Sequence, residues 1–66
     1  MKRPTLTERQ QEVLALLVQG NTMKEVAAIL KITPRTVAFH KYRMMSALKL
    51  SSSAELISYA VKRRIG

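Results

Sequence analysis

A link of three residues between two predicted helices restricts the fold of this 66-residue chain more than any other feature. A capping box at residues 22–25 opens a helix predicted at residues 23–30. Thr33 and Pro34 suit the N-cap and the first position of the next helix, predicted at residues 34–48. So short a link favours the steep crossing of a helix-turn-helix, with an ordinary corner in a small helical bundle as the alternative.

Two further capping boxes predict helices near both ends of the chain. Thr7 and Gln10 form one, and Ser52 and Glu55 form the other. No segment alternates apolar and polar residues as a strand does. The sequence therefore predicts an all-α fold, a four-helix bundle containing the helix-turn-helix, with helices at about residues 7–19, 23–30, 34–48 and 53–64. The apolar face of the second helix is expected to consist of Val26, Ala27, Ile29 and Leu30.

The net charge is strongly positive and unevenly distributed. Twelve Lys and Arg against four acidic residues give +8, and no acidic residue lies between Glu25 and Glu55. A basic stretch centred on one helix is typical of contact with nucleic-acid phosphates, although a solvated basic face is the simpler alternative. Because 47% of the residues are apolar, we expect residues 6–66 to fold as one domain, preceded by a linker or flexible start at residues 1–5.

The predicted third helix combines aromatic and basic side chains on one side. At helical spacing, Val37, Met44 and Leu48 fall on a narrow stripe, which predicts a core face. The opposite side carries Arg35, Ala38, Phe39, Tyr42, Arg43, Ser46 and Lys49. Aromatic rings among arginines indicate a binding surface, for DNA or for a partner protein.

The residue types argue against catalysis and membrane insertion. With one His (His40), no Cys and no Asp, the chain has no acid–base couple, no nucleophile–base pair and no metal cage. We therefore expect no enzyme activity, no metal and no cofactor, and a packing role for His40. No apolar run approaches the roughly 20 residues of a membrane span, and the N-terminus does not resemble a signal peptide, so a cytoplasmic location is expected.

Four motifs in order resemble the LuxR-type (GerE-type) helix-turn-helix domain of bacterial transcription and response regulators. They are LTERQQEVL at 6–14, GNTMKEVA at 20–27, TVxxH at 36–40 and AELxxYA at 54–60. The resemblance implies sequence-specific binding of double-stranded DNA by an output domain, with the third helix in the major groove. It also implies a homodimer on DNA through the fourth helix, and an N-terminal receiver or ligand-sensing domain absent from this chain.

The resemblance also implies roles for individual residues. Positions matching those that reach base edges are Arg35, Ala38, Phe39 and Tyr42. The expected phosphate contacts are Thr22, Lys24, Thr36, Lys41 and Arg43. Helical spacing gives the fourth helix one apolar face for the core, with Leu56, Tyr59 and Ala60, and a second apolar face with Ala54, Ile57, Val61 and Ile65. The second face is the candidate dimer seam, with a fraying apolar C-terminus as the alternative.

Three residues in or directly after the third helix depart from the family pattern. Because Ala38 and Phe39 provide no hydrogen-bond donor, contact with thymine methyl groups is expected in place of hydrogen-bonded reading of guanine. Lys49 stands where Gly or Asn usually closes the helix, which predicts slight backbone strain.

Three alternatives to this function remain. The promoter-recognising region of a sigma factor has a start much like residues 6–14, but the fourth helix argues against it. A protein-interaction module would use Phe39 and Tyr42 as anchors. A cationic membrane-surface helix is the weakest alternative, because a helical core uses the apolar stripes.

Overall fold

The computed structural model describes residues 6–63, which form four α-helices and no strand. The helices are α1 (Glu8–Val18), α2 (Met23–Leu30), α3 (Pro34–Leu48) and α4 (Ser53–Lys62). The predicted all-α fold is confirmed, and each described helix end lies within two residues of its predicted position. The predicted linker at residues 1–5, and the predicted last turn at Arg64, lie outside the described residues.

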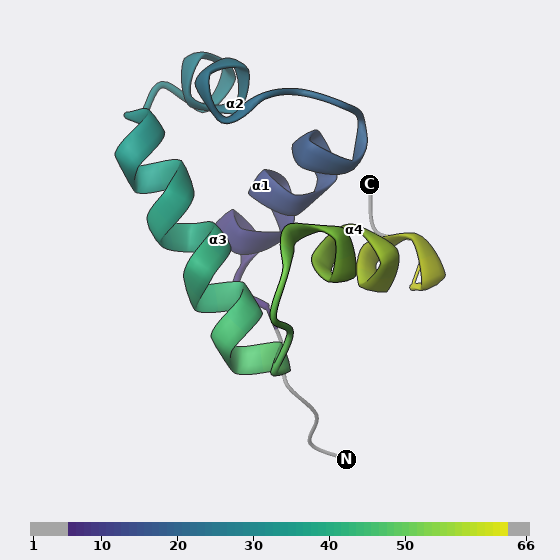
Figure 1. Ribbon diagram of the computed structural model, residues 1–66. Coiled ribbons are helices and arrows are strands. Elements are labelled where there is room, and N and C mark those ends of the chain that lie inside the picture. The colour runs from purple at the N-terminus through teal and green to yellow at the C-terminus, as the bar shows by residue number, and fades with distance from the viewer. Residues whose placement is uncertain (1–5, 64–66) are drawn as a thin grey trace.

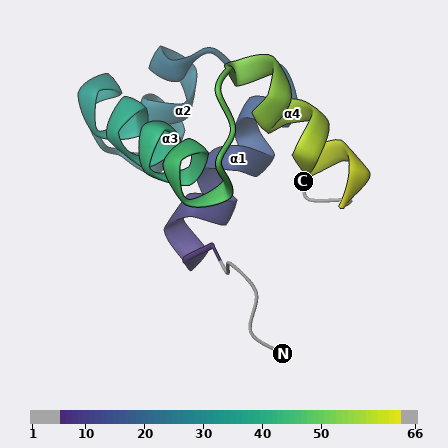
Figure 2. The ribbon, with the colours of Figure 1, turned by 60° about the horizontal axis from the view of Figure 1, so that its bottom comes forward.

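Helix α1 is the centre of the domain. It packs against each of the other three helices, and α2 packs against α3. In Figure 1, α3 lies along one side of the molecule, α2 crosses its N-terminal end, and α4 lies on the other side of α1. Figure 2 again shows α1 between α3 and α4. The fold therefore leaves one long side of α3 without a covering helix.

The helix starts follow the predicted caps, with one difference. Complete capping boxes join Thr7 to Gln10 and Thr22 to Glu25. At α4, Ser52 Oγ accepts from the Glu55 backbone N–H at 3.1 Å, but the Glu55 carboxylate accepts from the Ser51 N–H at 2.7 Å. The predicted third capping box is therefore only half formed. Ser52 has φ −148° where Thr7 has −68°, so the chain enters α4 with a different backbone conformation from that at α1.

Two lysines close helices in the left-handed backbone region. Lys31 ends α2 with φ 60°, and Lys49 ends α3 with φ 58°. The backbone turns sharply at both lysines. Ile32 N–H therefore donates to Ala27 C=O at 2.9 Å, and Leu50 N–H donates to Met45 C=O at 2.8 Å. Ile32 and Leu50 then pack against the core. Lys49, where slight backbone strain is predicted, thus adopts a conformation that residues with a Cβ atom rarely take, and Lys31 shares it.

The core is entirely apolar over the described residues. Its buried members are Leu6, Val13, Leu14, Val26, Ala27, Val37, Met44, Leu56 and Ala60. Val37 and Met44 are fully buried and Leu48 is partly buried, which confirms the stripe predicted on α3. Each fully buried side chain of this size stabilises the fold by about 1.5–3 kcal/mol.

One core prediction is wrong. Ile29 of α2 is 53% exposed, whereas Val26 and Ala27 are buried. Ile29 lies two positions after Ala27, which is about 200° around the helix, so the two side chains point in nearly opposite directions. A helix of eight residues beside two neighbours buries only a narrow stripe.

Candidate nucleic-acid interface

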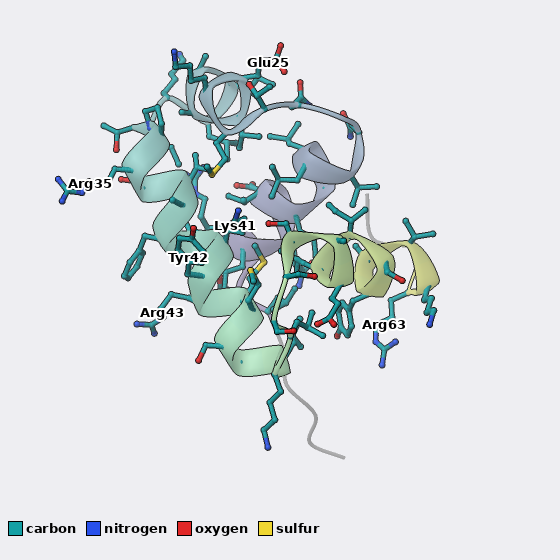
Figure 3. All side chains as sticks on the ribbon, viewed as in Figure 1. Glu25, Arg35, Lys41, Tyr42, Arg43 and Arg63 are labelled. Atoms are coloured by element: carbon teal, nitrogen blue, oxygen red, sulfur yellow. The ribbon has the colours of Figure 1, made fainter. Side chains whose placement is uncertain are left out.

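The uncovered side of α3 carries the residues predicted to face bases. Arg35 is exposed, Phe39 is 56% exposed and Tyr42 is 59% exposed, while Ala38 is half-buried between this side and the core. Figure 3 shows Arg35 and Arg43 extending from α3 away from the other helices. The structure thus brings the predicted base-facing residues together on one helix surface.

Cationic groups lie against both exposed rings of α3. The Arg43 guanidinium carbon lies 5.4 Å from the Phe39 ring centroid, and Lys41 Nζ lies 5.1 Å from that of Tyr42. The His40 ring meets Phe39 edge-on, with 5.9 Å between centroids and 65° between planes. His40 is half-buried, in keeping with its expected packing role. Such cation–π contacts contribute about 0.5–1 kcal/mol at exposed sites and restrict the side chains involved.

The start of α3 is fixed by two threonines. Thr33 Oγ1 accepts from the Thr36 backbone N–H at 3.1 Å, and the two hydroxyl oxygens lie 2.9 Å apart in a second hydrogen bond. Pro34 occupies the first turn, as predicted. The hydroxyl of Thr36, a predicted phosphate contact, is therefore already hydrogen-bonded to that of Thr33, and the residue as a whole is half-buried.

The remaining predicted phosphate residues lie in different places. Thr22 and Lys24 are exposed at the beginning of α2, where Thr22 caps the helix. Lys41 is half-buried, and its Nζ donates to Ser53 Oγ of α4 at 3.0 Å. Figure 3 places Lys41 between α3 and α4, away from Arg35 and Arg43. The sequence offered no signal for this hydrogen bond, which joins residues twelve positions apart.

The positive charge of α2 and α3 is not neutralised by carboxylates. Over residues 6–63, the one ion pair joins Arg9 and Glu12 of α1 at 3.4 Å. The carboxylate of Glu25, beside Lys24, accepts from the Thr22 N–H at 2.7 Å. The exposed cations of α2 and α3 therefore present a field that favours anionic ligands.

Part of the exposed surface of α4 is apolar. Leu56 and Ala60 are fully buried against the core, as predicted, while Ala54 is exposed, Ile57 is half-buried and Val61 is 59% exposed. Ile65, the fourth predicted residue of the seam, lies outside the described residues. Tyr59 is half-buried, and the Arg63 guanidinium carbon lies 4.4 Å from its ring centroid. One terminal helix thus exposes an apolar strip beside its core face.

The described residues contain no group of three or more His, Asp or Glu side chains that could hold a metal ion. None of the helices α1 to α4 has the length and apolar character needed to cross a membrane.

Comparison with known proteins agrees with this geometry. The family model described as "Bacterial regulatory proteins, luxR family" matches residues 4–60. The chain is 38% identical over 60 residues to the oxygen regulatory protein NreC of Staphylococcus carnosus (strain TM300), covering 91% of this chain and 28% of that protein. The identity and both coverages are the same for the oxygen regulatory protein NreC of Staphylococcus aureus (strain JH9). The chain therefore belongs to the luxR family of bacterial regulatory proteins, and it is a helix-turn-helix domain of the kind that binds DNA in transcription regulation.

Proposed function

We propose that this domain binds a specific double-stranded DNA sequence by inserting α3 into the major groove. The observation that carries the proposal is the uncovered side of α3, where Arg35, Phe39 and Tyr42 are exposed together on a helix that follows a three-residue turn. The second helix of a helix-turn-helix typically enters the major groove with its N-terminal residues nearest the bases.

Base reading and phosphate binding would use different residues. Arg35 and Tyr42 supply hydrogen-bond donors toward base edges, and Ala38 and Phe39 supply apolar contacts. Lys24, Thr22 and Arg43 are exposed and would hold phosphates. Lys24 lies in the first turn of α2, where the helix dipole disfavours a cation unless an anion is near.

Two of the residues predicted to contact phosphates already make hydrogen bonds within the free domain. Lys41 would have to give up its hydrogen bond to Ser53, and the Thr36 hydroxyl already pairs with Thr33. We therefore assign phosphate binding first to Lys24 and Arg43, and place Lys41 and Thr36 second.

Dimerisation on DNA would use the exposed strip of α4. Ala54, Ile57 and Val61 follow a spacing of three and four residues, so they share one side of the helix. Two domains joined through this strip would place their α3 helices in successive major grooves. Half-sites would then lie about 10 base pairs apart, one turn of DNA.

The whole protein would be a regulator larger than this domain. The chain spans 28% of the relative from Staphylococcus carnosus, which is named as an oxygen regulatory protein. The rest of such a protein would hold an N-terminal receiver or ligand-sensing domain. We propose a cytoplasmic location, where chromosomal DNA of a bacterium lies.

A protein-interaction module is the second candidate, because Phe39 and Tyr42 are each more than half exposed. A sigma-factor region is less well supported, since the family match at residues 4–60 includes most of α4.

Selection from random duplex DNA, followed by a salt series on the enriched duplex, separates these functions. DNA binding predicts an enriched sequence whose affinity falls steeply with salt, with a log–log slope of about −0.9 per phosphate contact. The absence of salt-sensitive binding would contradict DNA binding and favour the protein-interaction module.

A further inference from the structure

Near the middle of the uncovered side of α3 lies an aromatic ring that carries no hydrogen-bond donor of its own, that of Phe39. Arg35, Phe39 and Arg43 follow one another at intervals of four residues, so they form one row along the helix. Ala38, beside Phe39, adds only a methyl group. The polar groups therefore lie at the two ends of the row, and the side chain between them is apolar.

The Phe39 ring is held in place on the helix surface. The Arg43 guanidinium lies over one face at 5.4 Å from the centroid, and the His40 ring contacts it edge-on at 5.9 Å. Although it is held from two sides, Phe39 remains 56% exposed. A ring that is already oriented loses little side-chain entropy on binding, so the apolar contact that it makes in a complex is gained at small cost.

The major groove offers one apolar group at its base edges, the methyl group on C5 of thymine. A cytosine methylated at C5 carries a methyl group at the same ring position. An exposed phenyl ring, which carries no hydrogen-bond donor or acceptor of its own, complements that methyl group and does not complement the amino or carbonyl groups beside it.

We infer that Phe39 makes this domain a reader of C5-methyl groups, which recognises thymine and also 5-methylcytosine at the base that the ring faces. The inference rests on the proposed function, because it requires α3 to enter the major groove. It further specifies the ligand: at one position of each half-site, the methyl group determines affinity.

The first test replaces the thymines of the selected duplex with uracil, one position at a time. Uracil differs from thymine only in lacking the methyl group. Loss of one buried methyl group corresponds to about fourfold weaker binding. We expect that loss at one thymine of each half-site and near-equal affinity at thymines elsewhere.

The second test adds a methyl group where there is none. At the sensitive position, a C·G pair is compared with a 5-methylcytosine·G pair. The methylated duplex should bind about fourfold more tightly, by the same burial of one methyl group.

Variants assign the effect to the ring. With Phe39→Ala, the thymine and uracil duplexes should bind equally, and so should the cytosine and 5-methylcytosine duplexes. Ile29→Ala is the matched control, since Ile29 is an apolar side chain of similar exposure (53%) on α2 and should leave both differences unchanged. Phe39 lies outside the core, and circular dichroism checks that the variant folds.

The possible failures are distinguishable. If the selected duplex binds specifically but no uracil or 5-methylcytosine substitution changes affinity, methyl reading is overturned while the proposed function stands. Methyl sensitivity that persists in Phe39→Ala also overturns it. If no sequence is enriched at all, the proposed function fails, and methyl reading fails with it.

Discussion

Arg43 lies over the ring of Phe39, with its guanidinium carbon 5.4 Å from the ring centroid. The two residues are four positions apart on α3, so the contact lies along one side of the helix. The guanidinium carries five N–H donors, and the ring beside it carries none. One contact thus restricts both a cation and an apolar group on the side of α3 that is proposed to face DNA.

Replacing Tyr42 with Ala should weaken binding to the selected duplex by about 1–3 kcal/mol and relax base preference at the position that it faces. Tyr42 is 59% exposed on α3, so its removal should leave the fold intact. Binding to the selected and to random duplexes, measured by fluorescence anisotropy, gives the specificity ratio. Equal losses on both duplexes would contradict a base-reading role. Tyr42→Phe, which keeps the ring, separates the hydroxyl from the apolar contact.

Replacing Lys24 with Ala should weaken binding to all DNA about equally and reduce the salt slope by about one. Lys24 is exposed at the start of α2, where a phosphate would offset the unfavourable helix dipole. Lys62→Ala on α4 removes the same charge away from α2 and α3 and should leave the slope nearly unchanged. A loss confined to the selected duplex would show that Lys24 reads bases and does not hold a phosphate.

Replacing Lys49 with Gly should raise the free energy of unfolding by about 1 kcal/mol, because φ 58° strains any residue with a Cβ atom. Lys62→Gly is the matched control: Lys62 is helical, so Gly should lower stability there by roughly 0.5–1 kcal/mol. Urea unfolding followed by circular dichroism measures both. If Lys49→Gly destabilised the domain as Lys62→Gly does, backbone strain at Lys49 would be excluded.

Replacing Val61 with Asp should prevent the second domain from binding a duplex with two half-sites, while binding to a single half-site changes little. Val61 is 59% exposed on the outer strip of α4, so the charge would lie in the proposed seam and not in the core. Sedimentation velocity of the DNA complexes gives the stoichiometry. Two domains of the variant still bound cooperatively to one duplex would place the dimer seam elsewhere.

The helix positions could be predicted from the sequence because the caps are local interactions. Thr7, Thr22 and Thr33 each accept a hydrogen bond from a backbone N–H three residues later, and each helix begins at the next residue. The geometry at Ser52 could not be predicted, because it depends on a backbone φ set by the path of the chain from α3 to α4.

The candidate site was predictable where helical spacing alone decides exposure. Phe39 and Tyr42 lie opposite Val37 and Met44 on a helix of fifteen residues, and the structure exposes the first pair and buries the second. The position of Lys41 depends on how α4 packs, since its partner Ser53 belongs to that helix. Tertiary placement of this kind is not contained in the periodicity of one helix.

The most direct test of the DNA-binding surface is an NMR titration of the domain labelled with ¹⁵N, with the selected duplex as ligand. If α3 enters the major groove, the largest amide shifts should fall on residues 35–43, with a smaller group at Thr22 and Lys24. Shifts confined to α1 and α4, with the amides of Phe39 and Tyr42 unchanged at saturation, would contradict the account.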